Sequence, residues 1–373
     1  MKHLISSSLL VLSLALAAAP PQAEAQSDIL LRLRSGSPLG DRFRVDSAGG
    51  VVAIGELGIG IIPASGCGYR MMWYPYRGAF RAGTTDDGGA CNYWDDANIG
   101  FYSWAGGNLT KATLFTSFAF GDQVEVTAVS ATGFGASNTV SGTAGFAGGA
   151  LNRCTAAYCT AFGYTANAGG QGAVAIGYRV TADANYSVAL GHRASANGFA
   201  GAFVIADQST TDSLEASATN QFNSRYAGGY RLYTNATTTT GASLNAGGST
   251  WNAISDRNRK EHFLEIDGED ILARLRRVPV TSWNYIAEGT EVRHIGPMAQ
   301  DWHAAFGLND DSLTINTGDF DGVNLAAIQA LERRTTGQDG RIQALEAENA
   351  QLRAQNASLE ERLRRLEALL PTP

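Results

Sequence analysis

A glycine recurs every fourteen residues through the middle of this chain, and this period limits the folds that the chain can adopt. The seven positions are Gly107, Gly121, Gly135, Gly149, Gly163, Gly177 and Gly191. Small residues occupy the positions two and four residues before each glycine and, with two valines, the position five residues after it. A fixed short period indicates stacked units, each too small to bury a core by itself.

Fourteen residues can hold two short strands and two turns. The repeated glycine supplies a turn conformation that is closed to residues with a Cβ atom. Small side chains in register predict a narrow interior, which one added methylene per coil would overpack. The high glycine content, 44 of 373 residues, and the charged fraction of 17% agree with a repetitive β architecture. Such a slim solenoid exposes much apolar surface, so we expect several chains to associate and bury it.

The first 25 residues have the composition of a secretory signal peptide. Lys2 and His3 precede an apolar run that ends at Ala19, and small residues follow before Gln26. The sequence therefore predicts export, to the extracellular space or the cell surface, with the periplasm as a further possibility. No second long apolar stretch is present, so we expect no transmembrane helix in the mature protein.

Charge and cysteine content exclude several other classes. The formal net charge is −7 and the lysines do not cluster, which argues against nucleic acid as a partner. Four cysteines in an exported protein permit two disulfides, and proximity favours Cys67–Cys91 and Cys154–Cys159 among three connectivities. Their spacing is not that of a zinc site, and the acidic pairs lack EF-hand spacing. We therefore expect neither a metal nor a cofactor.

Lysine is rare in this chain, which uses arginine as its usual cation. After the predicted signal peptide only Lys111 and Lys260 remain, and Lys260 follows Ser255 by five residues. A lysine that loses its proton can serve as a base toward a nearby hydroxyl, whereas an arginine cannot. The spacing alone favours a solvated basic loop. A triad of Ser255 with Asp256 and His294 is a weaker catalytic alternative.

The best-formed glycine repeats resemble those in the head of trimeric autotransporter adhesins. They read Ala173-Val-Ala-Ile-Gly177 and Ser187-Val-Ala-Leu-Gly191, and the resemblance covers about residues 100–205. It implies a left-handed parallel β-roll that forms a trimer. It implies the architecture of the head and not the mechanism of autotransport.

From Thr250 to Leu331 the order of motifs resembles the intramolecular chaperone domain of phage tail spikes and endosialidases, also treated as a self-cleaving peptidase family. The shared features are Ser-Asp-x-x-x-Lys from Ser255, the Gly-x-x-Ala-Gln block at 296–300 and a final helix. In that family the domain trimerises a β-rich passenger and then cuts itself off before the serine. The resemblance implies Ser255 as nucleophile, Lys260 as general base and Ile254–Ser255 as the scissile bond. It also implies that Asp256 orients Lys260 or the loop.

Two positions of the opening motif depart from the family, which usually has Arg and Leu where this chain has Asn258 and Arg259. Attack by the serine hydroxyl on the preceding carbonyl needs an uncharged Lys260, which burial against Trp251 or a partner subunit would favour. An arginine in place of an apolar side chain would keep Lys260 hydrated. The chaperone fold can therefore persist where cleavage is lost.

Heptads of apolar residues from Ile328 to Leu370 predict a coiled coil. Between parallel, in-register chains the flanking positions would not pair like charges, which favours a parallel homo-oligomer. Asn349 and Asn356 occupy core positions and are expected to fix the register. They do not distinguish a dimer from a trimer, whereas the family resemblance implies a trimer.

Aromatic residues are dense in two stretches, Tyr69–Phe80 and Asn92–Trp104. Aromatic faces can stack on sugar rings, but filling a small β core is their more usual role. A host or glycan ligand on a cell surface therefore stays an open partner for this region.

Together these features predict an exported, elongated homotrimer that is mainly β. The expected segments are a signal peptide (1–25), a β-rich N-terminal region (26–100), the β-roll (101–206), a β connector (207–250), an α+β chaperone and self-cleaving domain (251–331) and a parallel coiled coil (332–373). The predicted function is a structural or adhesin-like surface protein whose chaperone domain drives trimerisation and cleaves once at Ile254–Ser255, a single-turnover serine peptidase. The alternative is a tail-fibre-like or carbohydrate-binding protein with a retained, non-cleaving trimerisation domain.

Overall fold

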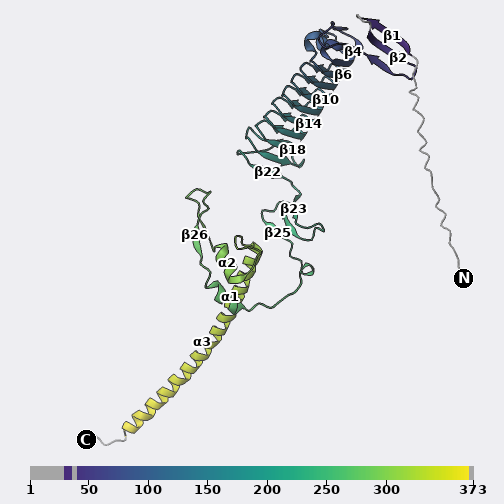
Figure 1. The fold of residues 1–373 in the computed structure, drawn as a ribbon. Coiled ribbons are helices and arrows are strands. Elements are labelled where there is room, and N and C mark those ends of the chain that lie inside the picture. The colour runs from purple at the N-terminus through teal and green to yellow at the C-terminus, as the bar shows by residue number, and fades with distance from the viewer. Residues whose placement is uncertain (1–28, 36–39, 369–373) are drawn as a thin grey trace, which may run out of the picture. The chain divides into compact units, whose positions relative to one another are not determined.

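The computed structural model describes residues 29–35 and 40–368, so the predicted signal peptide lies outside the described residues. The chain divides into two compact units between Ile254 and Ser255. The first unit is built of strands with a few short 3-10 helices, and the second contains the α-helices (Figure 1).

A parallel β-solenoid forms most of the first unit, which confirms the fold predicted from the glycine period. Each regular coil gives one five-residue strand to an 11-stranded sheet, the long-strand sheet, and one two-residue strand to an 8-stranded sheet, the short-strand sheet. The long-strand sheet contains β4 (Tyr69–Tyr74), β5 (Ala79–Thr84), β6 (Trp104–Asn108), β8 (Phe118–Asp122), β10 (Thr132–Ala136), β12 (Phe146–Ala150), β14 (Thr160–Tyr164), β16 (Val174–Tyr178), β18 (Val188–His192), β20 (Phe203–Ala206) and β22 (Phe222–Arg225). The short-strand sheet contains β7 (Lys111–Ala112), β9 (Glu125–Val126), β11 (Thr139–Val140), β13 (Arg153–Cys154), β15 (Asn167–Ala168), β17 (Thr181–Ala182), β19 (Ala194–Ser195) and β21 (Leu214–Glu215).

The columns of small residues fill the interior between the two sheets. Ala161, Ala175 and Ala189 are fully buried in the long-strand sheet, and Val126 and Val140 are fully buried opposite them. The repeated glycines lie in register between coils. A Cβ atom on any of them would overlap the backbone of the next coil, and each has a positive φ. The period therefore requires glycine both for its conformation and for the close approach of the coils.

Each coil also turns at two residues in the left-handed region, seven positions apart. Most of these corner residues are not glycine, for example Leu109, Thr116, Gln123, Ser130, Ser137, Ala144, Leu151, Tyr158, Thr165, Arg179, Tyr186 and Arg193. Left-handed φ values are unfavourable for residues with a side chain. Ladder hydrogen bonds offset this cost, as when the Arg193 N–H donates to the Tyr178 carbonyl at 2.9 Å.

The N-terminal end of the solenoid is closed by an antiparallel strand and a buried cation. β4 pairs antiparallel with β5, where every later strand of this sheet is parallel to its neighbour. Arg81 of β5 occupies the interior position that Ala105 fills in the next coil, and it is fully buried. Its guanidinium donates to the Ser103 carbonyl and hydroxyl, each at 2.9 Å, and to the Ala112 carbonyl at 3.0 Å. Burial lowers the pKa of Arg81 to about 9.

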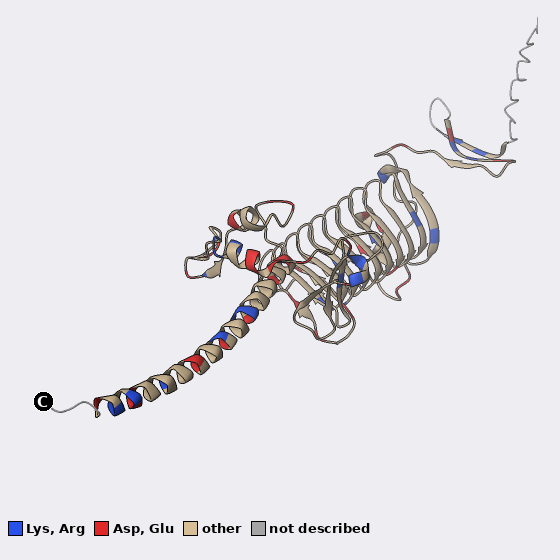
Figure 2. Cartoon of the chain, turned by 90° about the horizontal axis from the view of Figure 1, so that it is seen from below, with Lys and Arg blue, Asp and Glu red and all other residues tan. Residues whose placement is uncertain are grey.

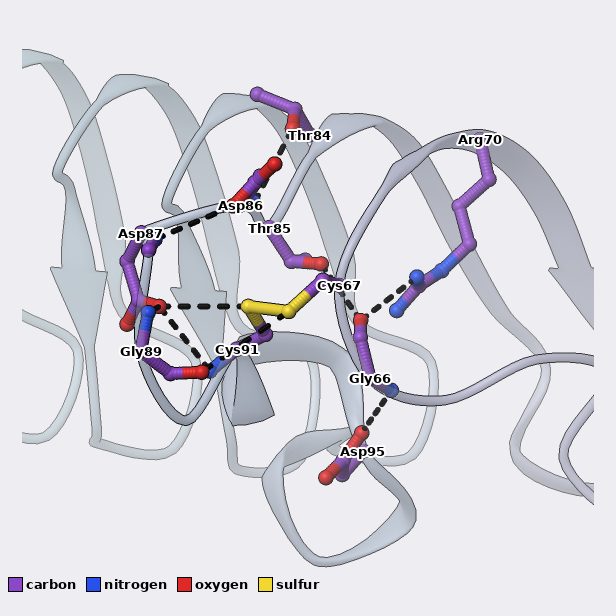
Figure 3. The surroundings of a disulfide bond; sticks show 11 residues. Gly66, Cys67, Arg70, Thr84, Thr85, Asp86, Asp87, Gly89, Cys91 and Asp95 are labelled. Carbon is purple, nitrogen blue, oxygen red and sulfur yellow. Dashed lines mark hydrogen bonds between the residues drawn. A yellow bond between two sulfur atoms is a disulfide. The ribbon is translucent and has the colours of Figure 1, made fainter.

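Both predicted disulfides, Cys67–Cys91 and Cys154–Cys159, are confirmed. The first joins the segment before β4 to the loop after β5 (Figure 3). In that loop the Asp87 carboxylate accepts hydrogen bonds from the N–H groups of Gly89 and Cys91, at 2.7 and 3.2 Å. The two sulfurs of this disulfide also lie beside Asp86. They are bonded to each other and therefore offer no thiolate to a metal.

The aromatic stretches are only partly used in a core. Met72, Tyr74, Trp94 and Ile99 form a buried cluster, and the Trp94 ring N–H donates to the Thr110 carbonyl at 2.8 Å. Trp104 instead lies on the outer face of the long-strand sheet and is 55% exposed. The expected core-filling role therefore holds for the buried cluster, whereas Trp104 faces outward.

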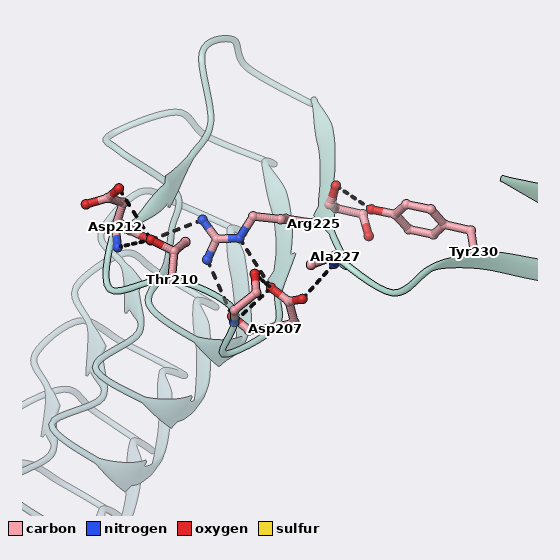
Figure 4. Close-up of polar contacts among 8 residues, drawn as sticks. Asp207, Thr210, Asp212, Arg225, Ala227 and Tyr230 are labelled. Carbon is pink, nitrogen blue, oxygen red and sulfur yellow. Dashed lines mark hydrogen bonds and ion pairs between the residues drawn. The ribbon is translucent and has the colours of Figure 1, made fainter. Parts of the chain in front are cut away.

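The last coils of the solenoid are longer than fourteen residues and are tied together by Asp207 and Arg225 (Figure 4). The Asp207 carboxylate accepts from the Ala227 N–H and the Ser209 hydroxyl, each at 2.7 Å, and from Arg225 Nε at 3.4 Å. These hydrogen bonds, that of the Ala227 N–H first, lower the pKa of Asp207 to about 2. Arg225 also donates to the Asp212 carbonyl at 3.1 Å, so one ion pair closes the C-terminal end.

Two small antiparallel sheets complete the first unit. The first contains β1 (Ile29–Ser35), β2 (Gly40–Asp46) and β3 (Val51–Ala53), and the second contains β23 (Gly229–Tyr233), β24 (Gly241–Asn245) and β25 (Trp251–Ala253). The 3-10 helices η1 (Pro75–Arg77), η2 (Asn92–Trp94) and η3 (Asp96–Asn98) lie between the strands at the N-terminal end of the solenoid.

The second unit packs two short helices against one long helix and also contains a hairpin. It contains η4 (Arg257–Arg259), α1 (Gly268–Leu275), β26 (Thr281–Trp283), β27 (His294–Gly296), α2 (Ala299–Phe306) and α3 (Thr317–Glu367). Its core consists of Ile271, Val278, Trp302, Val323 and Ala327. Side-chain caps start both α1 and α3, at Asp267 and Asn316.

The long helix α3 carries the predicted heptads on an uncovered surface. Leu345, Leu352 and Leu359 are each about half exposed, which fits the seam of a coiled coil. Charged residues of both signs alternate along α3, whereas the solenoid strands carry few (Figure 2). Among the described residues no helix has the length and apolar character needed to cross a bilayer.

Candidate functional site

Ser255 and Lys260 are brought together at the start of the second unit. Lys260 Nζ donates a hydrogen bond to Ser255 Oγ over 2.7 Å. The residues between them form η4 (Arg257–Arg259), and Lys260 leaves this turn in an extended conformation. One short turn thus bridges the five-residue spacing and returns the lysine side chain to the serine. A hydroxyl and an amine at this separation are within reach of proton transfer.

Asp256 supports the turn and does not contact Lys260. Its Oδ1 accepts from the Asn258 N–H at 2.9 Å and from the Asn258 side-chain amide at 3.2 Å. Its Oδ2 lies 3.6 Å from Arg259 Nε. Asp256 is therefore the N-cap of η4, and it shapes the loop that holds Ser255 and Lys260.

Asn258 and Arg259, the two departures from the family motif, both bind Asp256. They add polar contacts to the turn where the family has one apolar side chain. The Arg259 side chain is half exposed, and Arg259 directly precedes Lys260 in the sequence. These contacts fix the geometry of the turn and keep its surroundings polar.

Ser255 and Lys260 are both exposed in the described chain. Trp251 was expected to cover Lys260, but the Trp251 side chain is itself 55% exposed. An exposed amine is hydrated, and hydration favours its charged form.

His294 has a different partner from the one that the alternative triad requires. Its Nε2 lies 2.9 Å from Glu288 Oε2, and its ring packs on Trp283 with centroids 4.7 Å apart. The hydrogen bond from His294 lowers the pKa of Glu288. His294 thus belongs to the β26–β27 hairpin, and the structure does not join it to Ser255 and Asp256.

An open apolar cleft lies beside this hairpin. It is lined by Trp283, Tyr285, Ile286, Met298 and Leu313, among others. Ser255 and Lys260 are not part of the lining.

The comparison with known families covers this part of the chain. Residues 255–308 match the model of the family described as chaperone of endosialidase, and the match begins at Ser255. Domains of that family typically act in trimers. No curated protein matches the chain. The solenoid lies outside the matched range, so its resemblance to adhesin heads stays a prediction. The second unit thus contains an endosialidase-type intramolecular chaperone domain at residues 255–308.

Proposed function

We propose that this chain is an exported, homotrimeric surface protein of structural or adhesive type, and that its chaperone domain assembles the trimer and then cleaves the Ile254–Ser255 bond once. The observation that carries the proposal is the 2.7 Å contact between Lys260 Nζ and Ser255 Oγ. This contact lies where the two compact units meet in sequence and where the family match begins. Cleavage there would separate the solenoid from its chaperone without cutting a folded element.

The chemistry follows from the residue types. Uncharged Lys260 accepts the proton of the Ser255 hydroxyl, and Oγ attacks the carbonyl carbon of Ile254. The peptide C–N bond then breaks, and the Ser255 nitrogen takes the proton from Lys260 and becomes a free amine. An ester between the Ile254 carbonyl and Ser255 Oγ remains, and water hydrolyses it. The products are a chain that ends at Ile254 and a chain that begins at Ser255.

Assembly would control this reaction. Lys260 is exposed in the single chain, and only an uncharged amine can act as a base. A neighbouring subunit that covers Lys260 would favour the uncharged amine and start the reaction. The exposed heptad leucines of α3 supply the means of bringing subunits together. Cleavage would then report correct trimerisation.

Two features support export and a role at a surface. The first 25 residues have signal-peptide composition, and both disulfides suit an oxidising compartment. The resemblance of the coils to adhesin heads favours an adhesive or structural passenger, with a host or glycan surface as its target. Helical membrane anchoring gains no support from the described helices.

A second candidate function keeps the chaperone domain permanently. Arg259 occupies the position where the family has an apolar residue, and it directly precedes Lys260 in the sequence. If this charge keeps Lys260 protonated in the trimer, residues 255–373 stay attached and serve as a lasting trimerisation module. The protein would then be tail-fibre-like or carbohydrate-binding, with no enzymatic step.

The test is the intact mass of purified residues 26–373, wild type beside Ser255→Ala, with sedimentation equilibrium on both. The proposal expects the wild type to yield a fragment that starts at Ser255, and the variant to stay full length and trimeric. If the wild type and the variant both stay full length and trimeric, the proposed cleavage is wrong and the domain is a retained trimerisation module. A monomeric Ser255→Ala protein would remove the chaperone role itself.

A further inference from the structure

A column of stacked rings runs along one edge of the solenoid, at the residue that follows the repeated glycine. Tyr164, Tyr178 and His192 are in register on β14, β16 and β18. The Tyr164 and Tyr178 ring centroids are 5.4 Å apart with 12° between the planes, and those of Tyr178 and His192 are 5.2 Å apart with 3°. The rings cover one another's faces, so the column offers its ring edges to a ligand. The edge of an aromatic ring carries partial positive charge.

Two arginines occupy the corner that follows this column. Arg179 and Arg193 are left-handed corner residues of adjacent coils, and their N–H groups donate to the Tyr164 and Tyr178 carbonyls, each at 2.9 Å. Their Cα atoms are therefore one strand spacing apart, about 4.8 Å. The Arg179 guanidinium carbon lies 5.4 Å from the centroid of the Tyr178 ring. We call Tyr164, Tyr178, Arg179, His192 and Arg193 the basic edge.

The positive charge of the basic edge is not balanced by carboxylates of the described chain. Neither Arg179 nor Arg193 has an ion pair there, and Arg193 Nε is shielded from solvent without a hydrogen-bond partner. Residues 160–206 contain a single carboxylate, that of Asp183, which accepts from the Gly198 N–H at 2.9 Å. Like charges on neighbouring strands repel each other. The two adjacent guanidiniums therefore favour an anion from outside the chain.

The earlier coils have no cation in the same two columns. The residue after the glycine and the corner residue behind it are Asn108 and Leu109, Asp122 and Gln123, Ala136 and Ser137, and Ala150 and Leu151. The basic edge is thus a local feature of the later coils and not a property of the repeat. Burying unpaired guanidiniums against another copy would be costly, so we expect this edge to face solvent in the proposed trimer.

We infer that the basic edge binds a phosphate monoester carried by a surface saccharide. Such a group has a charge of about −1.5 to −2 at neutral pH and three acceptor oxygens, so it can neutralise both guanidiniums and accept from each. A carboxylate has only two oxygens, which one guanidinium fork satisfies. The inference rests on the proposed surface role and names the ligand class which that role leaves open.

The surroundings of the two arginines favour a saccharide as the carrier of the phosphate. Tyr164, Thr165 and Tyr178 are exposed beside them, and their hydroxyl groups can hydrogen-bond the hydroxyl groups of a sugar. A neutral sugar fits less well, because sugars stack on ring faces and this column covers its own faces.

The test is isothermal titration calorimetry of residues 26–373 at neutral pH and low salt, with glucose 6-phosphate, glucose 6-sulfate and glucose as probes. Arg179→Asn and Arg193→Asn each remove one guanidinium, and asparagine tolerates the left-handed corner. Arg153→Asn is the matched control, because it removes the same charge from β13 in the short-strand sheet. Arg179→Lys is a second variant should Arg179→Asn not fold, since lysine keeps the charge but lacks the fork.

We expect glucose 6-phosphate to bind at least about tenfold more tightly than glucose and about threefold more tightly than the singly charged sulfate ester. Arg179→Asn and Arg193→Asn should each weaken phosphate binding by at least about tenfold, Arg179→Lys by about threefold, and Arg153→Asn by less than about twofold.

Three results would overturn the inference. The sulfate ester could bind as tightly as the phosphate, Arg153→Asn could weaken binding as much as Arg179→Asn, or the chain could bind none of the probes. If the chain that fails to bind still trimerises and cleaves, the proposed assembly and cleavage stand. Phosphate binding by a chain that stays monomeric would support the basic edge and overturn the proposed trimer.

Discussion

The Asn138 side chain joins its own coil to Asn152 in the next one. Asn138 Oδ1 accepts from the Asn152 N–H at 2.8 Å, and its amide donates to the Phe134 and Gly149 carbonyls at 2.7 and 2.9 Å. Asn152 repeats the pattern one coil later. Both side chains are fully buried, and each satisfies backbone groups that would otherwise be unpaired inside the solenoid.

We expect Asn152→Ala to destabilise the solenoid by about 2–4 kcal/mol, because it leaves buried backbone groups without partners. Asn167→Ala, at the outward position of β15 in the short-strand sheet, is the matched control and should change stability by less than about 0.5 kcal/mol. Urea unfolding followed by circular dichroism measures both. Equal midpoints for the two variants would show that the buried amide contributes nothing.

Gly163→Ala should destabilise the solenoid by about 3 kcal/mol or more. Its φ is +123°, and the new Cβ would overlap the carbonyl of Gly177 in the next coil. Gly169→Ala is the control in the same coil, because a Cβ there would meet Asp183 at an ordinary 3.4 Å. Thermal unfolding should separate the two variants clearly. A Gly163→Ala protein as stable as Gly169→Ala would contradict the account of the glycine period.

The family-like motif should cleave faster than the natural one. In the double variant Asn258→Arg and Arg259→Leu, the residue that directly precedes Lys260 becomes apolar, as in the family, and the arginine moves one position away from Lys260 in the sequence, which favours the uncharged amine. We expect the fragment that starts at Ser255 to appear at least about tenfold faster, as followed by intact mass over time.

Lys260→Arg is the matched inactive control, both in the natural sequence and in the Asn258→Arg, Arg259→Leu double variant. It keeps the positive charge but cannot act as a base, so cleavage should fall by more than about a hundredfold. Trimerisation should persist, because α3 and the core of the second unit are unchanged. Cleavage that survives Lys260→Arg would assign the base to another group.

Acid should weaken the C-terminal end of the solenoid through Asp207. Its folded pKa is depressed to about 2 from an ordinary value of 3.8. A depressed carboxyl pKa gives stability that is complete above the ordinary value and is lost as the pH falls through the folded value. The unfolding temperature should therefore fall between about pH 4 and pH 2. Asp207→Asn should flatten that fall, and the exposed control Glu215→Gln should not.

The solenoid could be predicted because one local constraint is repeated many times. Gly163 and its equivalents need both a positive φ and a free approach for the next coil, so the requirement is written into the sequence at each coil. The disulfides were predictable from proximity alone, since Cys154 ends β13 and Cys159, five residues later, directly precedes β14.

Features that occur only once or twice escaped prediction. Arg81 closes the interior from a position that other coils fill with alanine, and nothing in its sequence neighbourhood marks it as buried. Asn138 and Asn152 do share one column, three residues after the glycine. Two copies are too few to stand out from composition, and their role depends on carbonyls from the neighbouring coil.

The candidate site also has features that the sequence predicted and features that it did not. The rarity of lysine and the family resemblance indicated Ser255 and Lys260 as a pair, and the structure places Lys260 Nζ in hydrogen-bond contact with Ser255 Oγ. The capping role of Asp256 depends on the φ and ψ of a single turn, which the motif does not encode. The cover that the proposed trimer would give Lys260 involves contacts between chains, which a single sequence does not display.

The paired corners of each coil give the solenoid one further property. Because every regular coil uses the same two left-handed corners, consecutive coils are stacked at one strand spacing, about 4.8 Å. Arg81 closes one end and the Asp207–Arg225 pair closes the other, and neither makes contacts that depend on the number of coils between them. The length of the solenoid is therefore set by the number of its fourteen-residue coils. Duplicating or deleting a whole coil would change the length of the solenoid by one strand spacing, and the contacts that close its two ends would remain.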